Sequence, residues 1–331
     1  MSGGMRGMIG AFARWGQPAE GNTVDEVLAN AKMDFDIGME SVYTKEGKAI
    51  KNQFRTFRKD TDETFGVVKG TYQVMQNKRL LQISDDLVKR GDIEWDKIGM
   101  VDNGRKVLAA FKLPEGFTVA GFDDIDQYIY LQNTNDGSGG IRIIPANVRI
   151  FCSNQFSHMD SSLRAAGINP RSLTIRHSSK QEERISQLAE AIKIVDHLNQ
   201  VFCENAEQLL TVQMSQDDRI NYYISTLGLT QKEEMMKGGK DYDANNPYGL
   251  GTRGQNTLTE LLELEQAPTN AANGMAGTAW GTFNTATEFI DHSWSYGKDG
   301  KSQDSKVESA IVGSGARIKS KAWDTMTEMY C

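Results

Sequence analysis

The stretch WDKIGMVDNGRKVLAAFKL (residues 95–113) decides the fold class. Apolar-rich stretches flank the dipeptide Asn103-Gly104 on both sides. Asn-Gly suits the two-residue type I′ turn that joins antiparallel strands, because both of its central residues adopt positive φ. The stretch therefore predicts a β-hairpin, and with it an antiparallel sheet.

More strands are expected around this hairpin. QFRTFRKD followed by TFGVV (53–68) reads as a second hairpin, and DQYIYLQN (126–133) as a strand. IRIIPANVRIFCSN (141–154) is expected to form a long strand that Pro145 interrupts. Because proline cannot donate to a ladder, we expect Pro145 at an edge or a bulge.

Helical periodicity brackets these strands. TVDEVLANAKM (23–33) and NKRLLQISDDLVKRG (77–91) predict two helices before the sheet. QEERISQLAEAIKIVDHLNQVFCENAEQLL (181–210) predicts a long helix with one apolar stripe, which needs a partner helix or another subunit to cover it. Shorter helical patterns follow up to the C-terminus.

The order of elements predicts an α+β fold with an antiparallel sheet in the middle of the chain, a long following helix and a helical C-terminal half. We expect three parts. They are an N-terminal segment (1–50), an α+β core (51–210) and a helical region (211–331). The glycine-rich stretch 236–256 lacks periodicity and reads as a mobile loop.

Composition limits the functional classes. The chain has 331 residues, and 37 Lys and Arg against 44 Asp and Glu give a net charge of −7. Binding of nucleic acid therefore needs a locally basic face. No apolar run approaches the roughly eighteen residues of a membrane span, and the start does not resemble a signal peptide, so we expect a cytoplasmic protein. The three cysteines lack the spacing of a zinc site or a disulfide framework.

The first candidate site is one face of the middle sheet. Alternation separates a polar set of side chains from apolar neighbours such as Val107, Ile129 and Val148. The polar set is Lys106, Lys112, Tyr128, Tyr130, Arg142 and Arg149. Cations follow phosphates and aromatic rings stack on unpaired bases, so this face would suit single-stranded nucleic acid. An ordinary solvated sheet face explains the same pattern.

The second candidate site is a helix in the segment 277–295. Asn284, Glu288, Asp291 and His292 lie four, seven and eight positions apart, which places them near one helix face. Carboxylates with a histidine suit magnesium or manganese. The alternatives are capping, salt bridges or a buried hydrogen-bond network. No motif implies any other cofactor, and no Ser-His-Asp order or reactive-cysteine motif is present, so a non-catalytic role is favoured.

The third candidate is Arg176-His177-Ser178-Ser179 before the long helix. A basic dipeptide at a helix N-terminus can bind a phosphate, and simple capping accounts for the same residues.

Several segments together resemble the phage/plasmid-like proteins, a bacterial and bacteriophage family long labelled as a domain of unknown function. They are Trp15-Gly16, VVKGTYQVMQN (67–77), NVRIFCSNQ (147–155), Arg176-His177-Ser178 and GTAWGTFNTATEFIDH (277–292). The resemblance implies a mobile-element gene acting in the bacterial cytoplasm. The element order of 77–210 is also similar to that of the single-strand annealing superfamily, whose members form rings or filaments on single-stranded DNA.

Three hypotheses follow. The first is a DNA-metabolism protein that binds single-stranded DNA as a homo-oligomer, with strand annealing as a further activity. The second is a metal-dependent enzyme that uses Glu288, Asp291 and His292. The third is a non-catalytic oligomeric interaction protein that assembles through the long helix 180–210. None of the three involves a membrane.

Overall fold

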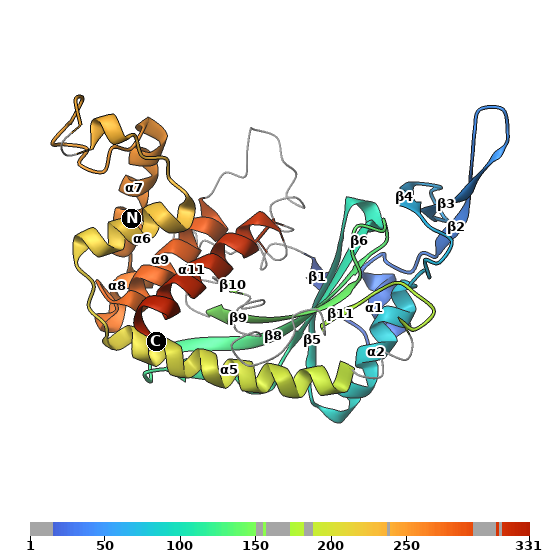
Figure 1. The fold of residues 1–331 in the computed structure, drawn as a ribbon. Helices are drawn as coiled ribbons and strands as arrows, with labels where there is room; N and C mark the ends of the chain where they lie inside the picture. Colours follow the sequence, from blue (N-terminus) through green and yellow to red (C-terminus); the bar gives the residue numbers. More distant parts are fainter. Residues whose placement is uncertain are drawn as a thin grey trace, which may run out of the picture.

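The computed structural model describes residues 16–149, 155–156, 173–181, 188–236, 239–293, 309–310 and 313–331. It has an α+β fold, as predicted, with antiparallel sheets in the N-terminal and middle regions and a helical C-terminal end (Figure 1). The larger sheet runs in the order β1-β5-β6-β8-β9-β10, with β7 on β8 and β11 on β9. Its strands are β1 (Gln17–Pro18), β5 (Glu94–Val101), β6 (Lys106–Lys112), β7 (Phe117–Val119), β8 (Asp123–Thr134), β9 (Ile141–Arg149), β10 (Gln155–Phe156) and β11 (Thr174–Ile175).

The hairpin that the sequence predicts forms between β5 and β6, but its turn is longer than predicted. Val101 pairs with Lys106, so four residues connect the strands instead of two. Asp102 and Asn103 both have positive φ, at 48° and 54°. Gly104 is required here, because a Cβ would lie 2.5 Å from the Phe35 ring. The length of this turn is therefore not determined by the Asn-Gly dipeptide alone, because Phe35 packs against Gly104.

Pro145 lies where we expected it, at an unpaired stretch of strand edge. On one side β9 pairs with β8, and Pro145 lies opposite Ile129. On the other side β11 pairs at Ile141 and Arg142, and β10 pairs at Asn147 and Val148. On that side residues 143–146 have no strand partner among the described residues, so Pro145 lies at a gap in the strand pairing, where a residue without an N–H is expected.

A second sheet contains β2 (Ile37–Tyr43), β3 (Ala49–Arg58) and β4 (Thr64–Val68) in that order. The β3–β4 pair confirms the hairpin expected in 53–68. The sequence patterns missed β2, and the predicted boundary at residue 50 falls inside the β2–β3 hairpin. The hydroxyl of Thr56 anchors this sheet to the larger one by donating to the Asn135 carbonyl at 2.6 Å.

Helices fill the rest of the described chain. They are α1 (Val24–Asn30), α2 (Asn77–Arg90), α5 (Leu188–Thr211), α6 (Gln216–Leu227), α7 (Thr252–Glu265), α8 (Pro268–Ala271), α9 (Ala279–His292) and α11 (Ser314–Tyr330). Three 3-10 turns, Asp102–Gly104, Glu233–Met235 and Ala272–Gly274, complete the elements. Both ends of α6 have the residues expected at helix caps. Ser215 accepts from the Asp218 N–H, and Gly228 ends the helix in the left-handed region.

In its described C-terminal part, the long helix α5 buries its apolar side chains within the chain. It packs against α9, α11, β7 and β9. Its buried Phe202 lies 4.5 Å from the ring centroid of Trp323 and 5.9 Å from that of Trp280. The partner helices that the sequence required are therefore α9 and α11, as Figure 1 also shows.

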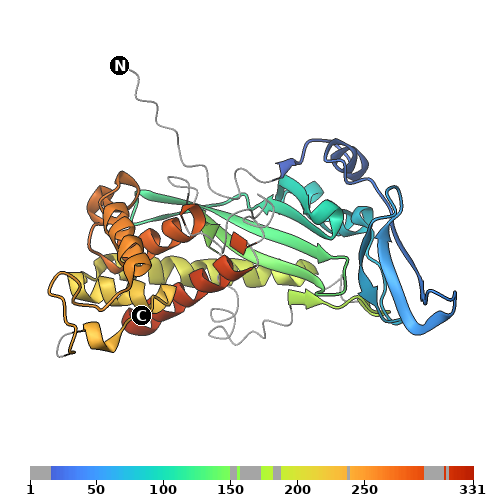
Figure 2. The ribbon, with the colours of Figure 1, turned by 90° about the horizontal axis from the view of Figure 1, so that it is seen from above.

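Apolar residues form two large clusters. The first joins α1, α2 and one face of the larger sheet, where Val107, Phe111 and Leu131 lie. The second joins the C-terminal helices around Trp280 and Trp323. Figure 2 shows the sheets and the C-terminal helices toward opposite ends of an elongated molecule. In the described ranges, no helix is long and apolar enough to cross a membrane.

Candidate nucleic-acid interface

The register of β6, β8 and β9 brings five of the six predicted nucleic-acid contacts to one sheet face. Lys112 lies directly opposite Tyr128, and Lys106 lies opposite Thr134. Tyr130 faces Ile144 and Arg142 faces Gln132 on the next strand. These positions share one side of the pleat.

The prediction that Arg149 shares this face with Arg142 is wrong. Arg149 pairs with Ile125, whereas Arg142 pairs with Gln132. The two arginines are seven positions apart on one strand, and an odd spacing places them on opposite faces. The position of Arg149 therefore falls on the side of Ile141 and Ile143.

The two tyrosines of this face are core residues. Tyr128 is 8% exposed and Tyr130 is 0% exposed, and their stacked rings lie 6.2 Å apart. They form a small apolar cluster with Leu108, Ile144 and Ala146. Burial raises the pKa of both phenols. Neither ring presents an open face, so the geometry gives base stacking at these positions no support.

Carboxylates lie among the cations of this face. Lys112 forms an ion pair with Asp126 at 2.8 Å. Asp96 lies beside Lys97, Lys112 and Tyr128, and burial raises the pKa of its carboxyl. A face that mixes both signs does not attract a polyanion as a basic track would. The predicted face is thus largely buried, and it mixes apolar side chains with charges of both signs.

A different element carries exposed cations. The distal part of the β2–β3 hairpin, residues 41–53, projects from the second sheet, and we call it the arm (Figure 1). β4 pairs only with Phe54–Phe57 of β3, so the arm is a two-stranded ribbon beyond the end of β4. The Thr44 N–H donates to the Lys48 carbonyl at 2.8 Å and closes its turn.

The arm is locally basic although the whole chain is acidic. It carries Lys45, Lys48 and Lys51 against one acid, Glu46. All three lysines are exposed, and none forms an ion pair within the described part of the chain. Tyr43 stands among them with 60% of its surface exposed. Cations beside an exposed aromatic ring are the combination that binds unpaired nucleotides.

Cations at the base of the arm have internal partners instead. Arg55 binds Glu40 at 2.6 Å and also Asp62. Arg58 binds Asp60 at 2.7 Å, and its guanidinium lies 3.8 Å from the Phe35 ring centroid. These pairs stabilise the second sheet and use the charges of its arginines. The lysines of the arm, in contrast, direct their charges to solvent.

The predicted metal-binding helix is α9, and its polar side chains have protein partners. Glu288 accepts from the Asn270 amide at 2.8 Å, and Asp291 binds Lys319 at 2.5 Å. Asn284 donates to the Trp280 carbonyl one turn earlier. Within the described ranges, no group of three or more His, Cys, Asp and Glu side chains could hold a metal ion. These contacts match the buried hydrogen-bond network that was the alternative to a metal site. Among the described residues, His292 belongs to no candidate metal-binding group.

The Arg176-His177 candidate is partly structural. His177 is 8% exposed, its ring lies 4.6 Å from that of Tyr72, and its Nδ1–H donates to the Gln73 carbonyl at 3.1 Å. Burial lowers the pKa of this histidine. His177 thus ties the segment before α2 to the segment after β11, while Arg176 remains exposed.

This burial predicts a pH-dependent stability. Since the pKa of His177 is lower in the folded state, the unfolded chain binds more protons below about pH 6.5. We expect a His177→Gln variant to lose less stability than the parent protein between about pH 7 and pH 5, by no more than about 1.4 kcal/mol per pH unit. Urea unfolding of both proteins across this range measures the difference. Parallel pH profiles would contradict it.

The arm was missed because its signals are weak in the sequence. The segment IGMESVY (37–43) has only partial alternation, and a bulge between Ser41 and Tyr43 breaks its pairing register. The three-residue spacing of Lys45, Lys48 and Lys51 around Gly47 was the available signal. A glycine-centred turn between short polar runs would have indicated a hairpin.

Comparison with known proteins gives one match. Residues 64–312 match the model of a family described as a domain of unknown function, DUF932. The match includes β4, most of the larger sheet, α5 and α9, and it begins after the arm. No curated protein and no solved structure matches the chain.

Proposed function

The chain belongs to the DUF932 family, and we propose that it binds single-stranded DNA, with the arm as its main contact surface. One observation carries the proposal. Three exposed lysines, which form no ion pair among the described residues, lie on the same projecting hairpin as the exposed ring of Tyr43. The proposal keeps the predicted ligand and moves its main contacts from the sheet face to the arm.

The arm has the chemistry for this task. Lysine ammonium groups neutralise phosphates, and each contact releases a condensed counterion. A tyrosine ring stacks on any base, which makes binding tolerant of sequence. The Thr44 hydroxyl already holds Glu46, and this hydrogen bond lowers the pKa of the Glu46 carboxyl. Glu46 is exposed and keeps its negative charge, so three lysines against this one acid give the arm a net charge of +2.

Assembly into a homo-oligomer, and strand annealing, belong to the same proposal. Two resemblances support them. Several sequence segments resemble those of phage/plasmid-like proteins, and the element order of residues 77–210 is similar to that of single-strand annealing proteins. The first of these resemblances also supports a mobile-element origin and a site of action in the bacterial cytoplasm. The alternative in which the long helix 180–210 is the assembly surface must use the part of that helix that α9 and α11 do not contact.

The metal-enzyme hypothesis gains no support from the described residues. A metal at Asp291 would have to displace Lys319 from a contact of 2.5 Å. Titration with magnesium, manganese and zinc, followed by calorimetry, tests it. Heat of binding that Glu288→Gln abolishes would restore this hypothesis.

Fluorescence anisotropy with a labelled oligothymidine, at low and at moderate salt, tests the proposal. We expect binding that weakens steeply as salt rises. Light scattering on the same sample gives the oligomeric state. Absence of binding at low salt would refute the DNA proposal, and a strictly monomeric complex would refute the assembly part. An Arg142→Ala variant tests the sheet face separately and should bind as the parent does.

A further inference from the structure

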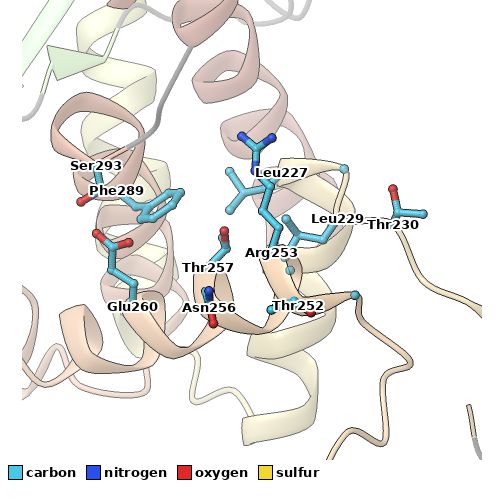
Figure 3. A pocket seen from close by; sticks show the side chains of 13 residues that line it. Leu227, Leu229, Thr230, Thr252, Arg253, Asn256, Thr257, Glu260, Phe289 and Ser293 are labelled. Atoms are coloured by element: carbon cyan, nitrogen blue, oxygen red, sulfur yellow. The ribbon is translucent and has the colours of Figure 1, made fainter. Parts of the chain in front are cut away.

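A cavity of about 660 Å³ lies where the ends of α6 and α9 meet the start of α7, and Figure 3 shows the side chains that line it. Its residues Leu227 and Phe289 are 6% and 4% exposed, and Arg253 already interacts within the protein. The cavity therefore offers a ligand little free surface. Free binding groups lie instead at the opposite end of the molecule, along the outer edge of β2 (Figure 1).

The strand β2 is the outer strand of the second sheet. Gly66 of β4 lies against the carbonyl of Asp136, which follows β8, so β4 is the strand on the side of the larger sheet. β2 lies on the far side of β3 and pairs with no other strand in the described ranges (Figure 1). One long side of β2 is therefore free of strand pairing.

Alternate residues of β2 direct their backbone N–H and C=O groups to this outer side. Gln76 shows which residues these are, because its side-chain amide donates to the Ile37 carbonyl and accepts from the Ile37 N–H, both at 2.9 Å. Directions alternate along a strand, so the groups of Met39, Ser41 and Tyr43 point the same way as those of Ile37. These groups form no hydrogen bond within the part of the chain that the structure describes. The Gln76 amide thus takes one position of a neighbouring strand and leaves the next three open.

We propose that this edge pairs with the same edge of a second copy of the chain, an inference that rests on the assembly part of the proposed function. An unpaired edge is a template for another strand, and two identical edges that pair antiparallel about a two-fold axis close the interface. With Ser41 opposite Ser41 of the second copy, Met39 lies opposite Tyr43 and about six hydrogen bonds form. Met39 then packs against one face of the Tyr43 ring, and the other face stays open to a base.

The side chains favour this register and this partner. Glu40, which binds Arg55 at 2.6 Å in its own chain, lies opposite Val42 of the second copy. In the neighbouring register two Glu40 carboxylates would face each other, which is unfavourable. Because the strands are antiparallel, the two basic arms point away from each other. Each arm runs toward the start of β2 in the other copy, where Asp34 is exposed and forms no ion pair among the described residues.

A Ser41→Cys variant tests the pairing directly. In this register the two Cα atoms at position 41 lie about 5.5 Å apart, which is within the range of a disulfide. We expect mild oxidation in the absence of DNA to give a covalent dimer on a non-reducing gel. Val67→Cys is the matched control, because Val67 is 55% exposed on β4 of the same sheet and away from the β2 edge. The parent protein gives the background from its own three cysteines.

A Ser41→Pro variant tests the hydrogen bonds. Proline removes the outward N–H and leaves the β2–β3 ladder intact, whereas Ser41→Val keeps the N–H and serves as control. We expect the dissociation constant of the Ser41→Pro dimer to rise by at least about 30-fold, because each dimer loses two hydrogen bonds. Sedimentation without DNA measures it, and circular dichroism establishes that both variants are folded.

Two results would overturn the proposal. One is a yield of covalent dimer from Ser41→Cys that does not exceed that of Val67→Cys. The other is equal association of folded Ser41→Pro and Ser41→Val. If the parent protein is an oligomer in these experiments, either result refutes this interface alone, whereas a strictly monomeric parent also refutes the assembly part of the proposed function. Because no step involves DNA, the outcome leaves the DNA contact of the arm to its own test.

Discussion

Replacing Lys319 by methionine is expected to destabilise the protein by about 3 to 5 kcal/mol. The side chains of Lys319 and Asp291 are 1% and 2% exposed, and their ion pair spans 2.5 Å between α11 and α9. Methionine fits the volume of the lysine stem but removes its charge. The carboxylate of Asp291 is then buried without its cation, which is the costly situation for a buried pair. Chemical denaturation measures the loss.

Two controls separate charge from shape. A double variant, Asp291→Asn with Lys319→Met, removes both charges and should recover most of the lost stability. Lys321→Met changes an exposed lysine on the same helix and should cost no more than about 1 kcal/mol. A loss below about 1 kcal/mol for Lys319→Met would contradict the pair as a buried contact between α9 and α11.

Neutralising the arm is the second large expected effect. In the triple variant Lys45→Gln, Lys48→Gln and Lys51→Gln, we expect affinity for single-stranded DNA to fall by about 100-fold at about 0.1 M salt. Each phosphate contact adds about 0.7 to the slope of log affinity against log salt for single strands, so three contacts account for about two log units at that salt. The slope itself should fall by about 2.

A matched variant controls for total charge. Lys232, Lys240 and Lys321 are exposed in the helical half, and their replacement by glutamine removes the same three charges far from the arm. This variant should keep the affinity of the parent protein within a few-fold. Equal losses in the two triple variants would show that net charge, and not the arm, governs binding.

Local sequence signals were sufficient for most elements. The Asn103-Gly104 dipeptide gave the central hairpin, and Thr23 and Gly91 sit at a start and an end of helices as capping rules require. Pro145 correctly predicted an interruption in the pairing along one edge of β9. Such features depend on a few neighbouring residues, which is why the sequence alone can indicate them.

The candidate site was harder to predict because alternation says which residues share a face but not what covers that face. Tyr130 has the same pattern whether it is exposed or, as here, buried. Lys112 and Asp126 meet only through the β6–β8 register, and Asp291 and Lys319 meet only when α9 packs against α11. Pairing across elements decides whether a charge is available to a ligand, and it is fixed by tertiary structure.

Photo-crosslinking tests the central claim most directly. A single-stranded oligothymidine with one iodouracil is bound at low salt and irradiated, and the crosslinked peptides are identified by mass spectrometry. We expect the crosslink at Tyr43, in the peptide that contains the arm, and we expect Tyr43→Ala to remove it. Crosslinks confined to the sheet face or to the helical half would contradict the arm as the DNA contact.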